Sequence, residues 1–261
     1  MRPSVNPSAA NHVCHPRFVI LAFALAFGTS VAWSWIFLRR DKFDPEPRRL
    51  LILLFLAGCA VTIPSALIEL AIPRNALTED TVVVPIVEEG FKLLAVAVIC
   101  WRSRHFNQLI DGAIYGVSCA LGFAAVENLF YGLTGGFGVL GLRTLVGPIS
   151  HPLFTGVGGF YLARAKFEGN PGRLYQGVLF GMLLHAGWNL GPGLMRQTGN
   201  ASYALVFVTV ALLYAWLLLR FLRRLETPDA QRLRTALAVG TVSPRSEPVI
   251  RSEPPPGARR P

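Results

Sequence analysis

The sequence has few charged residues for its length. Asp, Glu, Lys and Arg make up 15% of its 261 residues, whereas a soluble domain usually carries about 25%. Hydrophobic residues make up 52%, and they gather in long runs that lack the strict alternation of β-strands. This composition argues against an ordinary soluble domain and favours helices surrounded by lipid.

Cysteine is also scarce, and several protease signatures are absent. The four cysteines form no CxxC pair, so we expect neither a disulfide framework nor a zinc-ribbon site. The chain contains no GxSxG elbow, no HExxH and no pair of intramembrane aspartates with a GxGD pattern. The common serine, zincin and aspartyl protease plans are therefore disfavoured.

Long apolar segments are what the sequence does contain. A spanning helix needs roughly 20 mostly apolar residues, and we predict an all-α, polytopic transmembrane helix bundle with about seven spans. The fifth candidate contains Pro148 and Pro152, so its limits are soft and six spans remain an alternative. The candidates are residues 18–38, 50–72, 82–101, 110–133, 139–164, 175–193 and 202–222.

The basic residues are distributed unevenly between the segments that connect these spans. The net charge is +10, and of the 25 Lys and Arg residues 19 fall on one predicted side of the membrane and 4 on the other. Because basic residues concentrate on the cytoplasmic side, this bias predicts a topology with the N-terminus outside and the C-terminus inside. The charge therefore indicates topology and contact with membrane lipids, and it does not favour nucleic-acid binding.

The chain divides into one membrane domain and two tails. We assign residues 1–17 to an N-terminal tail and residues 18–222 to the transmembrane domain. Residues 223–261 are basic and rich in Pro and Arg, and they contain too few apolar residues to form a core. This composition predicts a disordered cytoplasmic tail. Within the spans, paired glycines such as Gly112 and Gly116 are typical of close helix packing.

Ionisable and polar residues interrupt four of the predicted spans. Each charge near the bilayer centre costs about 2.5–3.5 kcal/mol, so a cluster of them is a functional hypothesis by default. A rise of about 1.5 Å per residue places the polar groups of all four spans in the outer half of the bilayer. Arg143 is predicted to pair with a site carboxylate or a lipid phosphate. The other interrupting residues are Glu88, Glu89, Lys92, Glu127, Asn128, His151, His185 and Asn189.

This set of residues suits hydrolysis. Two neighbouring carboxylates in a low dielectric cannot both ionise cheaply, which tunes one of them as a general base that activates water. A histidine can protonate the leaving group, and an Asn or His N–H can stabilise an oxyanion. Glu88, Glu127, His151 and His185 are also candidate ligands of a divalent metal such as zinc.

The residues by themselves leave other functions open. A Glu–Lys pair can simply join two helices, and Glu, His and Lys clusters also mark proton relays in membrane transporters. A proton-coupled transporter and a non-catalytic membrane scaffold are therefore alternatives to a protease.

Four ordered blocks resemble the PrsW-type intramembrane proteases, which are related to the type II CAAX prenyl endopeptidase superfamily. EEGFK, at residues 88–92, resembles the EExxK motif, and FAAVEN resembles the FAxxEN element of the second motif. RTLVGPISHPLFTGVGG resembles the third motif, and LLHAGWN resembles the fourth, of HxxxN form. The resemblance covers residues 82–190, the motif core of the membrane domain.

The resemblance implies an intramembrane endopeptidase, which is a hydrolase. Family names also describe this group as metalloproteases. The resemblance also implies that Glu88 and Glu89 carry the acid–base role and that His185 completes the catalytic group. Residues implied to line the site or hold the oxyanion are Lys92, Glu127, Asn128, His151 and Asn189. The expected substrate is a single-pass membrane protein such as an anti-sigma factor, cut at the outer side of a bacterial cytoplasmic membrane.

Overall fold

The computed structural model describes residues 16–40, 45–72 and 76–225 of the chain. The described residues form helices and no strand, which confirms the all-α prediction. Residues 1–15 and 226–261 lie outside the described residues, and with them nearly all of both predicted tails. The elements are α2 (Pro16–Arg40), α3 (Arg48–Ala71), α4 (Ala76–Thr78), the π-helix η1 (Glu79–Val83), α5 (Val84–Cys100), α6 (Leu109–Glu168), α7 (Gly172–Thr198), the 3-10 helix η2 (Ala201–Tyr203) and α8 (Ala204–Leu225).

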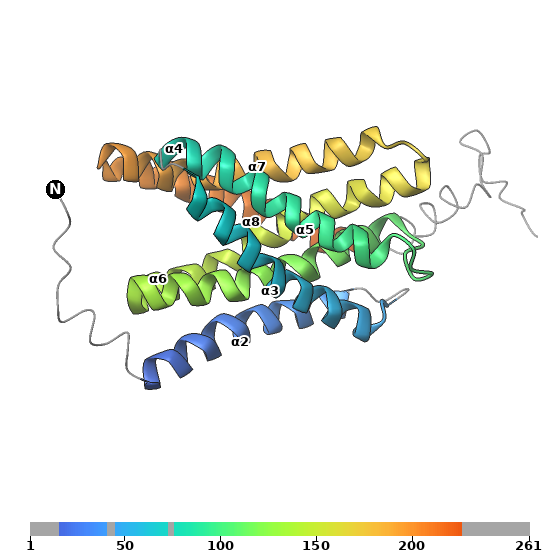
Figure 1. Cartoon of the computed structure of the whole chain (residues 1–261), viewed down its shortest axis with the longest axis horizontal. Helices are drawn as coiled ribbons and strands as arrows, with labels where there is room; N and C mark the ends of the chain where they lie inside the picture. Colours follow the sequence, from blue (N-terminus) through green and yellow to red (C-terminus); the bar gives the residue numbers. More distant parts are fainter. Residues whose placement is uncertain (1–15, 41–44, 73–75, 226–261) are drawn as a thin grey trace, which may run out of the picture.

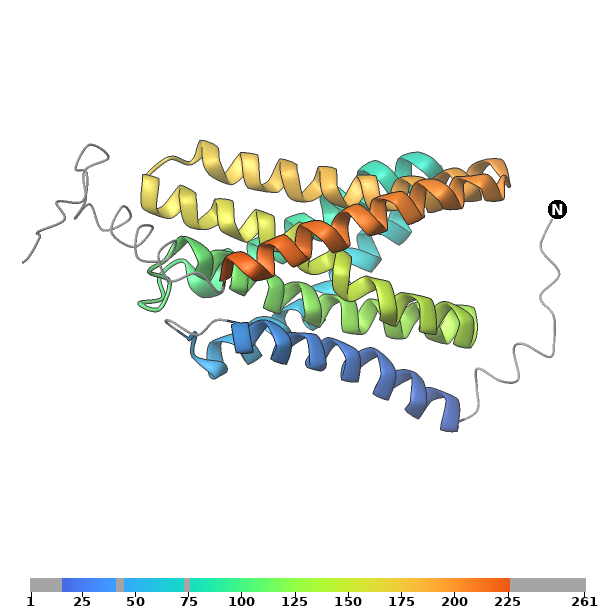
Figure 2. The same ribbon diagram turned by 180° about the vertical axis from the view of Figure 1, so that it is seen from behind.

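The longest element, α6, is a helical hairpin that contains two of the predicted spans. Gly136 has φ 77° and ψ −171°, backbone angles that only glycine adopts readily. The chain reverses there, and the arms 109–135 and 137–168 run back along each other (Figures 1 and 2). Proline at 148 and 152 lies within the second arm without ending it.

Several described helices can cross a membrane. Four are long and apolar enough: Pro16–Phe37, Arg48–Ala71, the α6 hairpin Leu109–Glu168 and Ala201–Arg220. This finding supports a membrane protein. The count of seven spans and the orientation with the N-terminus outside stay predictions.

The hairpin α6 forms the centre of the bundle and contacts α2, α3, α5, α7 and α8. Glycines allow the backbones to approach each other at the crossings. A Cβ atom on Gly112 would overlap the carbonyl oxygen of Gly159 between the two arms, and one on Gly58 would overlap that of Cys119 between α3 and α6. These contacts confirm the packing interpretation of the helix glycines.

The helix α5 has its polar face turned inward and its apolar face turned outward. Leu94 is 58% exposed and Val98 76% exposed, whereas Glu89 and Lys92 are fully buried. In water this arrangement would be unfavourable on both faces. The outer face would expose apolar side chains to water, and the inner face would remove charged groups from water. In lipid the outer face is stable, and the buried charges stabilise one another inside the bundle.

Candidate active site

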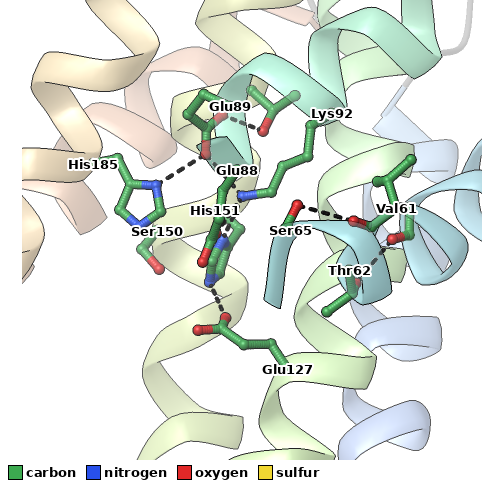
Figure 3. Close-up of polar contacts among 12 residues, drawn as sticks. Val61, Thr62, Ser65, Glu88, Glu89, Lys92, Glu127, Ser150, His151 and His185 are labelled. Carbon is green, nitrogen blue, oxygen red and sulfur yellow. Dashed lines mark hydrogen bonds and ion pairs between the residues drawn. The ribbon is translucent and has the colours of Figure 1, made fainter. Parts of the chain in front are cut away.

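The ammonium group of Lys92 is the centre of the buried polar cluster (Figure 3). Its Nζ lies 2.9 Å from Glu88 Oε2, 2.8 Å from Glu89 Oε1 and 3.3 Å from His151 Nδ1. The same nitrogen lies 3.9 Å from the centre of the Phe123 ring. The ammonium has three N–H donors, and the three polar contacts account for all of them. Lys92 therefore contacts both carboxylates of its own helix and a histidine of α6.

Glu89 is held by groups from three other positions. Its Oε1 atom, besides contacting Lys92, lies 3.1 Å from His185 Nδ1 of α7. Its Oε2 atom accepts a hydrogen bond of 2.7 Å from the hydroxyl of Thr155 in α6. The whole residue is buried, and both of its oxygens are engaged by the protein. Glu89 thus links α5, α6 and α7 at one point.

His151 connects this centre to a second ion pair. Its Nε2 atom lies 2.9 Å from Glu127 Oε2, and the other oxygen of Glu127 lies 2.7 Å from Arg143 Nη2. Arg143 Nε also donates a 3.2 Å hydrogen bond to Asn128 Oδ1. Of the two partners predicted for Arg143, the structure shows the site carboxylate. In Figure 3 dashed lines join Glu127 to His151 and His151 to Lys92.

The two asparagines take different places. Asn128 is buried, and within the described part of the chain its Nδ2 atom has no hydrogen-bond partner. Asn189 lies one turn after His185, and its Nδ2 donates a 2.9 Å hydrogen bond to the backbone carbonyl of Asp80 in η1. The side chain of Asp80 in turn pairs with Arg196 of α7. Asn189 therefore joins α7 to the π-helical turn rather than to the glutamates.

A cavity of about 740 Å³ reaches the cluster from one end of the bundle. Its polar lining includes Glu127, His151 and His185, together with Arg143 and Asn189. Glu88 and Glu89 are not among the lining residues and lie behind the two histidines that contact their cluster. The apolar lining includes Val139, Leu142 and Val146 of the second arm of α6, Trp188 of α7 and Phe207 of α8.

Comparison with known proteins identifies the family of the chain. The family model of the PrsW family intramembrane metalloproteases matches residues 46–217, which include every residue of the cluster. The chain belongs to the PrsW family. It is therefore a peptidase and a membrane protein.

Curated relatives extend the agreement over most of the membrane domain. The protease PrsW of Clostridioides difficile (strain 630) is 32% identical over 162 residues, 56% of this chain and 68% of the relative. Those of Oceanobacillus iheyensis and Bacillus subtilis (strain 168) are 30% and 27% identical and cover 71% and 66% of this chain and 86% and 82% of their own length. No solved structure matches the chain.

The description of the PrsW family as metalloproteases makes a metal plausible, and the donor atoms test it. Among the described residues, Glu88, Glu89 and His151 bring three ligand atoms within 4.8 Å of one another. These are the residues that contact Lys92 Nζ at 2.8–3.3 Å. A divalent ion among them would lie against a buried ammonium of the same sign, and the repulsion is strong in a low dielectric. In this arrangement the three donors fit the lysine and do not fit a metal.

Sequence reasoning found most of this site and missed three of its contacts. Every predicted site residue lies in or beside the cluster, although Asn189 is turned toward Asp80. Thr155 was missed, yet it follows His151 by four residues and so shares its helix face. Asp80 and Arg196 carried no detectable signal, because they are separated by 116 residues and meet only through the packing of η1 on α7.

Proposed function

We propose that this PrsW-family peptidase is an intramembrane endopeptidase that cleaves a single-pass membrane protein by glutamate-dependent activation of water. One observation carries the proposal: a buried cluster of glutamates and histidines lies at the polar end of a 740 Å³ cavity inside a bundle of apolar helices. Hydrolysis inside a membrane requires a general base, bound water and a cavity that admits a peptide, and this arrangement supplies a place for each.

The water is activated by Glu89 acting through His185. A carboxylate only accepts hydrogen bonds, so the contact with Glu89 places a proton on His185 Nδ1 and leaves the lone pair on Nε2. The imidazole takes a proton from the water as the oxygen attacks the peptide carbonyl, and it then gives that proton to the leaving amine. The carboxylate of Glu89 stabilises the imidazolium that forms in between.

The developing oxyanion needs a donor on the cavity wall. Asn189 lines the cavity, and its amide nitrogen carries two hydrogens, one of which is donated to the carbonyl of Asp80. The second can be donated to the oxyanion. The sequence by itself favours a glutamate as the general base that activates the water. The burial of both Glu88 and Glu89 favours a relay through His185 instead.

The substrate class follows from the surroundings of the site and from the family resemblance. Away from the polar cluster the cavity wall carries apolar side chains, among them Leu142 and Val146 of α6 and Phe207 of α8, which suits the side chains of a transmembrane segment. We propose an anti-sigma-factor-like substrate, cleaved in the outer half of the bacterial cytoplasmic membrane by a protein of seven spans with its N-terminus outside. No metal takes part in this scheme, because Lys92 supplies the positive charge between the donors.

The test uses a reporter with one apolar segment of about 20 residues between two tags, reconstituted in liposomes with the purified protein. We expect cleavage by the wild type and none by Glu89→Gln or His185→Ala. Glu168→Gln and His105→Ala are matched controls, since Glu168 pairs with Arg164 away from the site and His105 lies in the loop before α6. Full cleavage by Glu89→Gln would overturn the glutamate mechanism. Uptake of solute driven by a proton gradient, lost in the same variants, would favour a transporter.

A further inference from the structure

Arg143 joins the two arms of the α6 hairpin at the edge of the site. It lies seven residues after Gly136, and its partners lie on the arm before that residue. Nη2 contacts Glu127 and Nε donates to Asn128, while the guanidinium carbon lies 3.8 Å from the centre of the Tyr131 ring. One side chain therefore contacts three residues within a single turn of the opposite arm. Its charge and its planar face are both occupied by the protein.

Lys92 and Glu127 contact the two ring nitrogens of His151. Lys92 only donates hydrogen bonds, so the 3.3 Å contact requires a lone pair on His151 Nδ1. The imidazole is then neutral, and its one N–H is at Nε2, which lies 2.9 Å from Glu127 Oε2. Arg143 holds Glu127 by its other oxygen at 2.7 Å. The orientation of His151 thus depends on a carboxylate that Arg143 keeps in place.

The formal charges explain why an arginine is needed there. Glu88, Glu89 and Glu127 bring three negative charges into the bundle, and Lys92 compensates one of them. Glu127 is the carboxylate that does not contact Lys92. Without a cation of its own it would be free to leave His151 for water in the cavity, because its side chain is 15% exposed. The guanidinium compensates the charge of this carboxylate through Nη2, and its own direction is fixed by Nε, which donates to Asn128.

We propose that Arg143 is a positioning residue of the active site: it holds Glu127 against His151 Nε2 and so fixes the orientation of the imidazole, whose other nitrogen contacts Lys92. Its importance for cleavage rests on the proposed function. Its effect on His151 does not, because it follows from the contacts alone.

The direct test is nuclear magnetic resonance of the purified protein labelled with ¹⁵N-histidine, in which the two ring nitrogens report the tautomer. Comparison with His151→Gln assigns the signals of His151. We expect a single neutral tautomer with the proton on Nε2 in the wild type. In Arg143→Met we expect a shifted or broadened Nε2 signal, because the imidazole keeps its contact with Lys92 and loses that with Glu127. Arg164→Met is the matched control, since it removes an arginine that pairs with Glu168 on the same helix. Arg143→Lys, which keeps the charge and loses the planar guanidinium, should change the Nε2 signal less.

Cleavage of the single-pass reporter gives a second, separate readout. Because a misplacement of a site group by about 1 Å can cost roughly 10²-fold in rate, we expect a loss of this order in kcat for Arg143→Met with KM unchanged. If Arg143 acts through Glu127, adding Arg143→Met to Glu127→Gln should cause no further loss.

Three outcomes separate the hypotheses. An unchanged His151 signal in Arg143→Met and Arg143→Lys would overturn the positioning role. A further loss in the double variant, with a raised KM, would also overturn it and would assign Arg143 to substrate contact. A wild type that cleaves no reporter, while Arg143→Met still alters the His151 signal, would overturn the proposed function and support the positioning of His151.

Discussion

The polar cluster has two halves that differ in burial. In the lysine half, formed by Lys92 with Glu88 and Glu89, the side chains are at most 4% exposed. In the arginine half, formed by Arg143 with Glu127, they are 25% and 15% exposed and line the cavity. His151 contacts both halves. From this difference we expect the lysine half, whose Glu89 also contacts His185, to contribute most to stability, and the arginine half to position groups at the cavity.

The largest effect is expected in the lysine half. Replacing Lys92 by Met leaves two buried carboxylates without their cation, and removal of one partner from a buried ion pair typically costs about 3–5 kcal/mol. We expect loss of folded protein and of cleavage together, measured by thermal unfolding in detergent and by the reporter. Arg164→Met should leave both measurements nearly unchanged. A Lys92→Met protein with wild-type stability would contradict the structural role of this half.

The next effect separates catalysis from stability. His185→Gln removes the imidazole that joins Glu89 to the cavity, and loss of a general base typically reduces the rate by roughly 10²- to 10⁴-fold. The melting temperature should fall much less than in Lys92→Met, because the three contacts of the ammonium remain. Activity within tenfold of the wild type would show that His185 does not carry the proton.

A smaller effect is expected at Thr155, which holds the second oxygen of Glu89. Thr155→Val keeps the shape of the side chain and removes one hydrogen bond to a charged group, worth about 1.5–3 kcal/mol. We expect lower stability and slower cleavage, measured on the same samples. Thr209→Val is the control, since that hydroxyl bonds only to the carbonyl of Leu205 within the exposed face of α8. Equal effects of the two variants would count against a site role for Thr155.

The smallest effect on stability is expected at the Asp80–Arg196 pair. The side chain of Asp80 is 8% exposed and that of Arg196 is 62% exposed. Because the guanidinium lies in solvent, we expect the pair to contribute about 0–1 kcal/mol, as exposed ion pairs do. We expect Arg196→Gln to alter the melting temperature only slightly, and less so at high salt because salt screens the pair. A large loss of stability, independent of salt, would show that the contact holds η1 onto α7.

Chelation is expected to have no effect. Because Lys92 occupies the place between Glu88, Glu89 and His151, treatment with a zinc chelator should leave reporter cleavage unchanged, and elemental analysis of the active protein should show no bound metal. Loss of cleavage that zinc restores would contradict this expectation and would require the ammonium to move.

Much of the fold and part of the site could be predicted because they depend on local sequence. Apolar runs predicted the helices to within a few residues, and the spacing of Glu88, Glu89 and Lys92 by three and four residues accounts for their meeting on one helix face. The hairpin turn at Gly136 lies between the predicted spans 110–133 and 139–164, and α6 reverses there. Helical periodicity is a short-range property, so a single sequence is enough to read it.

The pairing between helices could not be predicted in this way. The sequence left two partners open for Arg143 and placed Asn189 at the site without giving it a partner. In the structure Arg143 pairs with Glu127, and Asn189 is bonded to the backbone of Asp80. The resemblance of the sequence motifs gave the acid–base role to Glu88 and Glu89. In the structure the cavity is lined by the two histidines that contact their cluster, and neither glutamate is a lining residue. Each of these differences concerns residues on separate helices.

By itself the sequence determined that this is a helical membrane protein, and its four motif blocks indicated a PrsW-type protease with charges gathered within its spans. Only the tertiary structure decided which charge meets which, and which groups reach the cavity. The physical reason is that residues on one helix are related by a fixed rise and rotation. The rotation and depth of one helix relative to another are set by close packing, as at the crossings of Gly58 with Cys119 and Gly112 with Gly159.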